Sequence, residues 1–195
     1  MSALIRPAAE ADRQGIADTV VEAFYDQFKS LTTDKEAVAA ALAPMLNLPQ
    51  FTVAEQEGCI VGAVGLNDEN AYAVTIKPDV LKKAVGFIRG TMAAPILREE
   101  FNRPGRFEPG QAQVDFVSVR ESSRGQGIAR AMLQHVLAKG YRLFTLDVTE
   151  GNERVLPLYQ SVGFVQTGRE QEKMAKMKGF SFRYLMAYRP AGRQG

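Results

Sequence analysis

Two apolar segments, with a glycine-containing turn and an amphipathic helix between them, constrain the fold of this chain most strongly. Residues Val114–Val119 and Leu143–Val148 are typical of buried strands, and residues 124–139 predict a helix that Gly140 ends. A strand, a helix and a strand within about 35 residues form a βαβ unit, in which the two strands run parallel. We therefore expect a parallel strand pair with a covering helix.

The segments around this unit predict further strands and helices. Strands are expected at Leu4–Arg6, Phe51–Glu55, Cys59–Leu66 and Phe182–Tyr188, with a hairpin joining the middle two. Helices are expected on the stripe from Ile16 to Phe28, after the capping-box spacing Thr33–Glu36, from Pro78, after Pro95 and near residues 153–162. The predicted fold class is α/β (α+β), with one mixed central sheet flanked by helices. We expect a single domain over residues 1–190 and a flexible tail at 191–195.

The composition is that of an ordinary globular protein. The chain has 195 residues, of which 46% are hydrophobic and 24% charged, and it can build one core without disulfides or a structural metal. Its one cysteine, Cys59, excludes an internal disulfide and a cysteine-based zinc site, and we expect it in the core. The one histidine, His135, is expected on the surface of its helix.

Charge and hydropathy exclude two classes of partner. The formal net charge of +2 is too small to indicate nucleic-acid binding. The longest uncharged apolar run, Cys59–Leu66, is far shorter than the roughly 18 residues of a membrane-spanning helix, and the first residues lack the apolar stretch of a signal peptide. We therefore expect a soluble, cytoplasmic protein that binds neither nucleic acid nor a membrane.

The turn Arg124-Gly125-Gln126-Gly127 leads into the central helix and favours an anion-binding site. The first N–H groups of a helix have no internal partner, and the positive end of the helix dipole lies behind them. Gly125 and Gly127 let a phosphate approach the backbone, and Arg124 and Arg130 add positive charge.

Two known phosphate-binding loops fit this turn poorly. The P-loop pattern is absent, and the dinucleotide pattern G-x-G-x-x-G/A fails at its last position, where Arg130 stands. Asp147 lies about 20 residues farther on, where dinucleotide-binding proteins carry a ribose-binding acid. A nucleotide-dependent oxidoreductase therefore stays open as an alternative.

Two motifs resemble those of one known family. The segment Arg124–Ala129 resembles the R/Q-x-x-G-x-G/A signature of the GNAT superfamily of N-acetyltransferases. Residues Asn152–Phe164 resemble the second motif of that family, N-x-x-A-x-x-L-Y-x-x-x-G-F, in both spacing and order. The resemblance covers nearly the whole chain and is loose over residues 67–112.

The chain departs from the family pattern at three positions, Glu121, Val155 and Pro157. Glu121 stands where proline is frequent, and Val155 stands where a small residue is usual. Pro157 falls in the helix that presents Tyr159 and is expected to delay or kink that helix unless it lies in the first turn. This departure keeps open a second function, that of a catalytically inactive CoA-binding sensor or interaction module.

The resemblance implies direct transfer of an acetyl group from acetyl-CoA to the primary amine of a small molecule or peptide, without a metal. The sequence leaves the identity of the acceptor open, and a homodimer is compatible with it because dimers are common in the family. Asn152 is implied either in cofactor contact or as the N-cap of its helix. The residues implied in cofactor binding are Val117, Ser118, Val119, Arg124, Gly125, Gln126, Gly127, Ile128, Ala129, Arg130 and Asn152.

Two residues are the candidates for catalysis. The resemblance implies that Tyr159 donates a proton or a hydrogen bond to the departing sulfur, which a neutral phenol can do at pH 7. Asp115 interrupts an apolar strand, and a carboxylate there is either hydrogen-bonded or serves as a base for the acceptor ammonium. A core tyrosine and a structural aspartate are the alternative interpretations. Glu22 and Glu55 are weaker candidates for the base.

Overall fold

One mixed sheet forms the centre of the protein in the computed structural model, which describes residues 3–28, 34–102, 107–173, 175 and 179–190. The strand order is β1-β2-β3-β4-β5-β7-β6. Neighbouring strands are antiparallel except for β4 and β5, which run parallel as the βαβ pattern predicts. The strands are β1 (Leu4–Pro7), β2 (Phe51–Gln56), β3 (Cys59–Asp68), β4 (Gln111–Val119), β5 (Leu143–Thr149), β6 (Val165–Gln171) and β7 (Phe182–Tyr188).

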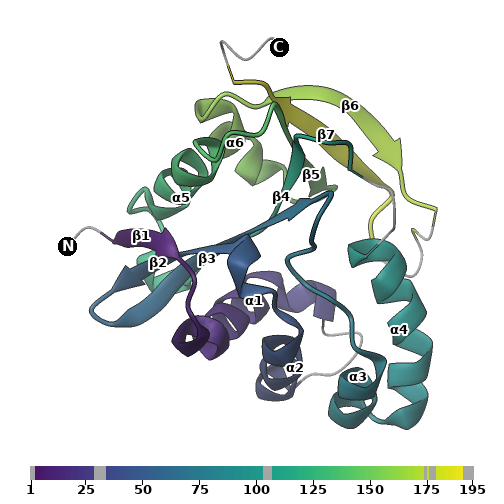
Figure 1. Cartoon of the computed structure of the whole chain (residues 1–195). Helices are drawn as coiled ribbons and strands as arrows, with labels where there is room; N and C mark the ends of the chain where they lie inside the picture. Colours follow the sequence, from purple (N-terminus) through teal and green to yellow (C-terminus); the bar gives the residue numbers. More distant parts are fainter. Residues whose placement is uncertain (1–2, 29–33, 103–106, 174, 176–178, 191–195) are drawn as a thin grey trace.

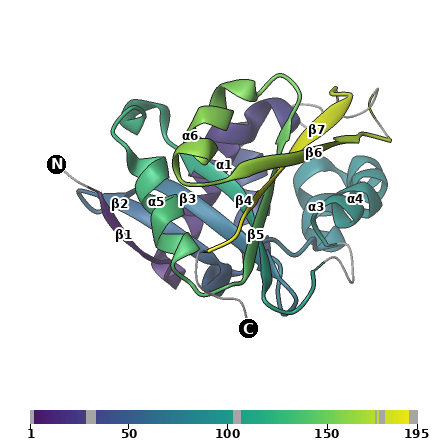
Figure 2. The same cartoon turned by 90° about the horizontal axis from the view of Figure 1, so that it is seen from above.

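Helices cover both faces of this sheet (Figures 1 and 2). Helices α1 to α4 lie on one face, and α5 and α6 lie on the other. The helices are α1 (Arg13–Phe28), α2 (Lys35–Leu42), α3 (Pro78–Val85), α4 (Phe87–Phe101), α5 (Ile128–Leu137) and α6 (Leu156–Ser161). The observed fold is therefore the predicted mixed sheet between two helical layers.

Each face of the sheet has its own hydrophobic core. On the α1–α4 face, Ile16, Val20 and Phe51 are fully buried and pack in one cluster with Phe116 of β4. On the α5–α6 face, a second cluster of equally buried side chains contains Met132, Leu133, Phe144 and Phe164. Strand residues alternate between the two clusters, because successive side chains of a strand point to opposite faces.

Strands β4 and β5 diverge after a short parallel ladder. Within the described residues, their pairing is confined to three pairs that join Gln111–Gln113 to Leu143–Thr145. Strand β4 also contains a bulge. Between the pairs Gly65–Asp115 and Ala63–Ser118, two residues of β4, Phe116 and Val117, lie opposite one residue of β3. We call the remaining parts, Val114–Val119 and Leu146–Thr149, the diverging ends.

The structure confirms most of the predicted elements and corrects several details. The predicted helix 124–139 begins at Ile128, because Gly127 adopts a left-handed conformation that no helix continues through. Strand β6 was not expected, since its polar and mostly exposed residues lack the alternation of a half-buried strand. The predicted tail at 191–195 lies outside the described residues.

Three further expectations were wrong. Helix α4 begins at Phe87 and carries Pro95 in its interior, instead of starting after that proline. Asp34 caps α2 by accepting a 3.0 Å hydrogen bond from the Ala37 N–H, whereas the predicted cap, Thr33, lies outside the described residues. Cys59 is exposed at the start of β3 rather than buried in the core.

Candidate active site

The turn before α5 is open on its outer side. Gly125 and Gly127 have φ angles of +77° and +78°, and a Cβ atom added at either position would meet no atom within 4 Å. Gly127 occupies the N-cap position and supplies no side-chain oxygen, so no side chain caps the first N–H groups of α5. These groups therefore face a space that the chain leaves unfilled, next to an exposed Arg124.

The side chains around this turn are held by neighbouring elements. Arg124 donates a 3.2 Å hydrogen bond from Nε to the Val119 carbonyl oxygen, which ties the turn to the end of β4. Gln126 accepts one from Gln56 of β2. Arg130 donates from its guanidinium to the Ser161 carbonyl at the end of α6, at 3.1 Å. Ile128 is buried and Ala129 half-buried, so their side chains anchor the helix below the turn.

The edge of β4 beside this turn exposes main-chain groups. The Arg120 N–H donates to the Val61 carbonyl of β3, and the pairing side alternates along a strand. The main-chain groups of Val119 therefore point away from β3, toward the diverging end of β5, whereas Val117 lies in the bulge, where this alternation is interrupted. Ser118 is used inside the sheet, where its hydroxyl donates to the Ala63 carbonyl at 3.2 Å.

Helix α6 presents Tyr159 in a fixed position. Pro157 lies in the first turn of α6, where its missing N–H costs no helical hydrogen bond. Helix α6 begins at Leu156, after the 3-10 turn Glu153–Val155, so the predicted late start of the helix is confirmed. Gly163 has φ +101°, and a Cβ there would lie 2.9 Å from the Tyr188 ring. This turn returns the chain so that Phe164 packs edge-on against Tyr159, with ring centroids 6.1 Å apart.

Tyr159 is 9% exposed and lies in the cluster of the α5–α6 face. Burial raises the pKa of its hydroxyl well above the usual value of 10, and the negative charges of Asp115 and Asp147 raise it further. Within the residues that the structure describes, this hydroxyl has no hydrogen-bond partner. The phenol is therefore neutral at physiological pH, and the charges of two carboxylates act on it.

The two carboxylates belong to the opposite face of the sheet. The neighbours of Asp147 along β5, Leu146 and Val148, pack in the α5–α6 cluster, so Asp147 points to the α1–α4 face. Asp115 accepts hydrogen bonds from the Asn67 side-chain amide at 3.3 Å and from the Phe116 N–H at 2.9 Å. Tyr159 of one sheet face thus feels the charges of two carboxylates on the other face, both of which lie in the diverging ends.

Asp147 belongs to a polar network that the sequence did not reveal. It accepts a 2.8 Å hydrogen bond from the Gln113 amide and forms a 3.0 Å ion pair with Arg183. Arg183 also pairs with Glu172 at 3.1 Å, and both side chains are 15% exposed or less. The signal was present, since Asp147 interrupts an apolar strand in the same way as Asp115, but its partner Arg183 lies 36 residues away.

The other predicted residues take simpler places. Asn152 occupies the N-cap position of a short 3-10 turn, Glu153–Val155, but its side chain makes no capping hydrogen bond. Glu22 accepts a hydrogen bond from the Glu121 N–H at 2.7 Å, and Glu55 pairs with Arg6. Both alternative bases are therefore engaged in other contacts. His135 is exposed on α5, as expected.

Two features are absent from the described part of the chain. It contains no group of three His, Cys, Asp or Glu side chains that could hold a metal ion. None of its helices combines the length and the apolar character that crossing a bilayer requires.

Comparisons with known proteins identify the family and the fold of this chain. The model of the Acetyltransferase (GNAT) family matches residues 13–164. The structure is similar to that of a histone acetyltransferase HPA2 and related acetyltransferase from Corynebacterium glutamicum, with a TM-score of 0.67, 23% identity and full coverage of both chains.

Two further solved structures share the fold at lower identity. An N-acetyltransferase from Staphylococcus aureus has a TM-score of 0.60 at 18% identity, over 95% of this chain and 100% of that chain. A ribosomal-protein-S18-alanine N-acetyltransferase from Escherichia coli has a TM-score of 0.58 at 14% identity, over 99% of this chain and 98% of that chain. A search of curated proteins finds no significant match. The family match spans more than three quarters of the sequence, and the chain therefore belongs to the GNAT family of acyl-CoA-dependent N-acyltransferases.

Proposed function

We propose that the protein transfers the acetyl group of acetyl-CoA directly to the primary amine of a small molecule or peptide. The observation that carries this proposal is the turn before α5, whose left-handed glycines and uncapped N–H groups are tied to the end of β4 at the place where β4 and β5 diverge. We assign to Tyr159, a neutral phenol, and to the Asp115 carboxylate the proton donation and the proton acceptance that transfer from a thioester to an ammonium requires.

The turn before α5 fits the diphosphate of acetyl-CoA. Its two left-handed glycines leave open space, and the first N–H groups of α5 have no side-chain cap. Arg124 adds a positive charge beside them. We assign the diphosphate contacts to the main chain of residues 124–129 and to Arg124. Arg130, which also donates to Ser161, holds α5 against α6 and adds charge to the same site.

The edge of β4 fits the amide-containing arm of acetyl-CoA. The main-chain groups of Val119 face the diverging end of β5, and we assign to them and to those of the neighbouring Val117 the amides of this arm, which binds there as an added strand would. Ser118 supports this edge through its bond to Ala63. The Asn152 side chain, which caps no helix, is assigned to a contact with the cofactor. This path leads from the turn before α5 to Tyr159.

The proton movements follow from the positions of two side chains. Asp115, held by Asn67 and by the Phe116 N–H, takes a proton from the acceptor ammonium, directly or through water. The neutral amine then forms the new N–C bond at the acetyl carbon while the C–S bond breaks. The Tyr159 hydroxyl donates its proton to the departing sulfur, which leaves as the thiol of CoA, and the resulting phenolate regains a proton from the nitrogen of the new amide, directly or through water. The main-chain N–H near Val119 is assigned to the oxygen on which negative charge develops.

The proposal is tested by thiol release from acetyl-CoA with a panel of primary amines. We expect wild type to acetylate at least one amine, and Tyr159→Phe and Asp115→Asn each to lower kcat by about 10²-fold or more. Tyr188→Phe is the matched control, because Tyr188 packs in the same cluster and lies outside the reaction site. Equal rates for wild type and Tyr159→Phe, or transfer to no amine despite binding of acetyl-CoA, would contradict the proposal. The E. coli relative named for ribosomal-protein alanine is the reason to include peptides in the panel.

A further inference from the structure

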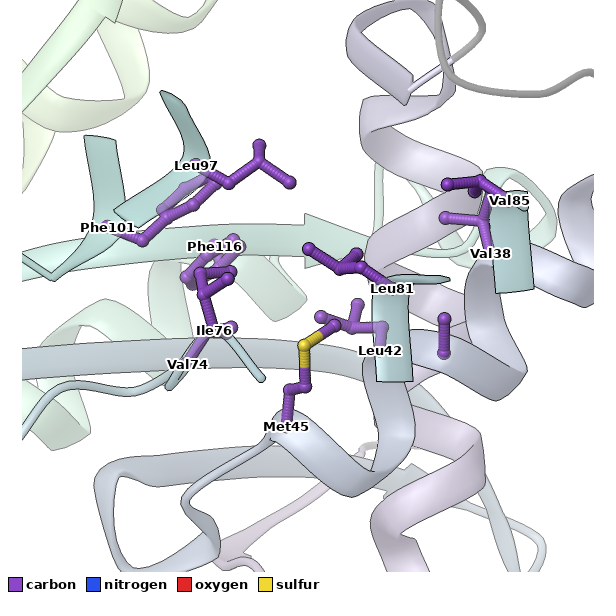
Figure 3. Close-up of a pocket in the computed structure, with 11 residues that line it drawn as sticks. Val38, Leu42, Met45, Val74, Ile76, Leu81, Val85, Leu97, Phe101 and Phe116 are labelled. Carbon is purple, nitrogen blue, oxygen red and sulfur yellow. The ribbon is translucent and has the colours of Figure 1, made fainter. Parts of the chain in front are cut away.

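An apolar cavity lies on the α1–α4 face of the sheet, beside the candidate active site (Figure 3). Its volume is about 40 Å³, and every side chain that lines it is apolar. The lining comes from α2, the 3-10 turn Ala43–Met45, α3, α4, the segment between β3 and α3, and β4. Leu97, Phe101 and Phe116 gather at one end of the cavity, and Val38 and Val85 at the other.

The end of the cavity at Phe116 adjoins the proposed base. Phe116 is the bulge residue of β4, with a φ of +52° that is rare outside glycine. It directly follows Asp115, and its own N–H donates to the Asp115 carboxylate at 2.9 Å. The Phe101 ring lies 5.5 Å from the Phe116 ring, between centroids. The bulge therefore places a carboxylate and an apolar wall side by side on the same face.

The cavity lies at the margin of the core. Val85, Leu97 and Phe101 are only partly buried, whereas Ala41 and Leu81 are 6% and 4% exposed. A packing defect at the centre of a core would differ from this cavity, because only fully buried side chains would line it. We place the entrance for a ligand substituent at the partly buried wall that α3 and α4 contribute.

From this arrangement we infer that the cavity receives the aliphatic substituent of the acceptor amine. The inference rests on the proposed function, because it takes Asp115 as the group that meets the acceptor ammonium. A water-sized probe needs about 10–15 Å³, so the cavity holds a chain of a few carbons. Since no polar atom lines it, a second charged or polar group on that chain is excluded by the cost of burial. The acceptor class is thus a primary amine that carries a short aliphatic group.

A series of unbranched alkylamines tests this inference, since its members differ in chain length and hardly in the basicity of the amine. We expect kcat/KM for acetyl transfer to rise about fourfold per added methylene from ethylamine to butylamine, a factor of about 16 over the series. Longer alkyl chains no longer fit the cavity, so kcat/KM does not rise beyond butylamine. 1,4-Diaminobutane, which ends in a second ammonium, falls at least about 100-fold below butylamine.

Variants of the lining make the test specific. Ala41→Leu fills the cavity from α2, so the ratio of kcat/KM for butylamine to kcat/KM for ethylamine falls to about 1. Ala40→Leu, at an exposed position of the same helix, leaves this ratio unchanged. Leu97→Ala enlarges the cavity at its partly buried end, so the optimum moves to a longer chain. Leu97→Ala therefore keeps the inference testable if Ala41→Leu does not fold, as judged by its melting temperature.

The outcomes separate this inference from the proposed function. Acetyl transfer that does not depend on chain length, or a dependence that Ala41→Leu leaves unchanged, overturns the inference and leaves the function standing. Transfer to no amine overturns the proposed function. In that case calorimetric titration of butylamine into wild type and Ala41→Leu, both saturated with CoA, tests the cavity alone, and equal affinities overturn it.

Discussion

The Gln113 side chain of β4 donates a 2.8 Å hydrogen bond to Asp147 of β5, at the point where the two strands part. Gln113 and Thr145 form the last backbone pair of the parallel ladder, and Asp147 lies two residues farther along β5. The bond therefore spans the start of the divergence. It holds Asp147, with Arg183, at the place where its charge acts on Tyr159.

Removing this bond is expected to weaken the fold. Gln113 is 6% exposed, so Gln113→Leu keeps its bulk but deprives the partly buried Asp147 carboxylate of a donor. We expect the free energy of unfolding, measured in urea, to fall by about 1–3 kcal/mol. Gln134→Leu, at an exposed position of α5, is the control and should change it by less than about 0.5 kcal/mol. An equal effect of both substitutions would show that the bond does not stabilise the divergence.

Gly127→Ala is expected to weaken the binding of CoA. A Cβ at this position enters the open space before α5 and imposes a left-handed conformation on a residue that avoids it. Losing one charge-assisted hydrogen bond to the diphosphate corresponds to at least about a tenfold rise in Kd, measured by calorimetry. Gly58→Ala in the β2–β3 turn, with a φ of +76° and equally open surroundings, carries the same backbone cost and should leave Kd unchanged. Weaker binding in both variants would assign the effect to folding instead.

The raised pKa of Tyr159 predicts a pH dependence. A phenol whose pKa lies above the usual value of 10 keeps its proton from pH 7 to pH 10 and loses it only at higher pH. The ratio of kcat for wild type over Tyr159→Phe should therefore stay constant across this range. The two pH–rate profiles measure it. A ratio that falls with a midpoint below pH 9 would mean that the phenol ionises there, against the effect of its burial.

Asp12 predicts a change of stability with pH. The Arg6 guanidinium, which donates two hydrogen bonds to this buried carboxylate, is the main cause that lowers its pKa from 3.8, and the Ala9 N–H adds to this. The stability that Asp12 contributes is present above its pKa in the unfolded chain and is lost as the pH falls through the lowered pKa of the folded state. Asp12→Asn should lower the free energy of unfolding by about 1–3 kcal/mol at pH 7, and the difference should shrink below pH 4.

Asp79→Asn is the control for this prediction. Asp79 is 91% exposed and its contact with Lys82 is 3.8 Å long, so its loss should change stability by less than about 0.5 kcal/mol at any pH. A difference between wild type and Asp12→Asn that persists unchanged at pH 2, measured by urea unfolding, would contradict the assignment.

The elements with strong local signals were predictable from the sequence. The βαβ unit, the β2–β3 hairpin and the final strand all carry the hydrophobic periodicity of their class, and the structure confirms them. Strand β6 was not predicted, because its own residues are polar and its formation depends on pairing with β7. Helix α4 was misplaced because tertiary packing tolerates Pro95, which local rules treat as a helix start.

The candidate site was predictable in its turn and in Tyr159, but not in its polar partners. The glycines and the tyrosine lie in two short motifs, and the spacing of the residues within each motif predicts where they lie in the site. The contacts of Asp115 with Asn67 and of Asp147 with Arg183 join residues 48 and 36 positions apart. Such contacts depend on the strand register, which a single sequence does not reveal. The effect of Pro157 likewise depended on where α6 begins. In the first turn this proline costs no helical hydrogen bond, whereas one turn later it would.

The two separate hydrophobic cores have a consequence for how this molecule can evolve. Helices α3 and α4 bury their side chains against the cluster of one sheet face, while α5 and α6 belong entirely to the other. Substitutions that reshape the α3–α4 hairpin are therefore absorbed without disturbing the packing beneath the glycine turn. This division lets one half of the protein diversify while the other stays constant, and it makes the hairpin an exchangeable module for engineering.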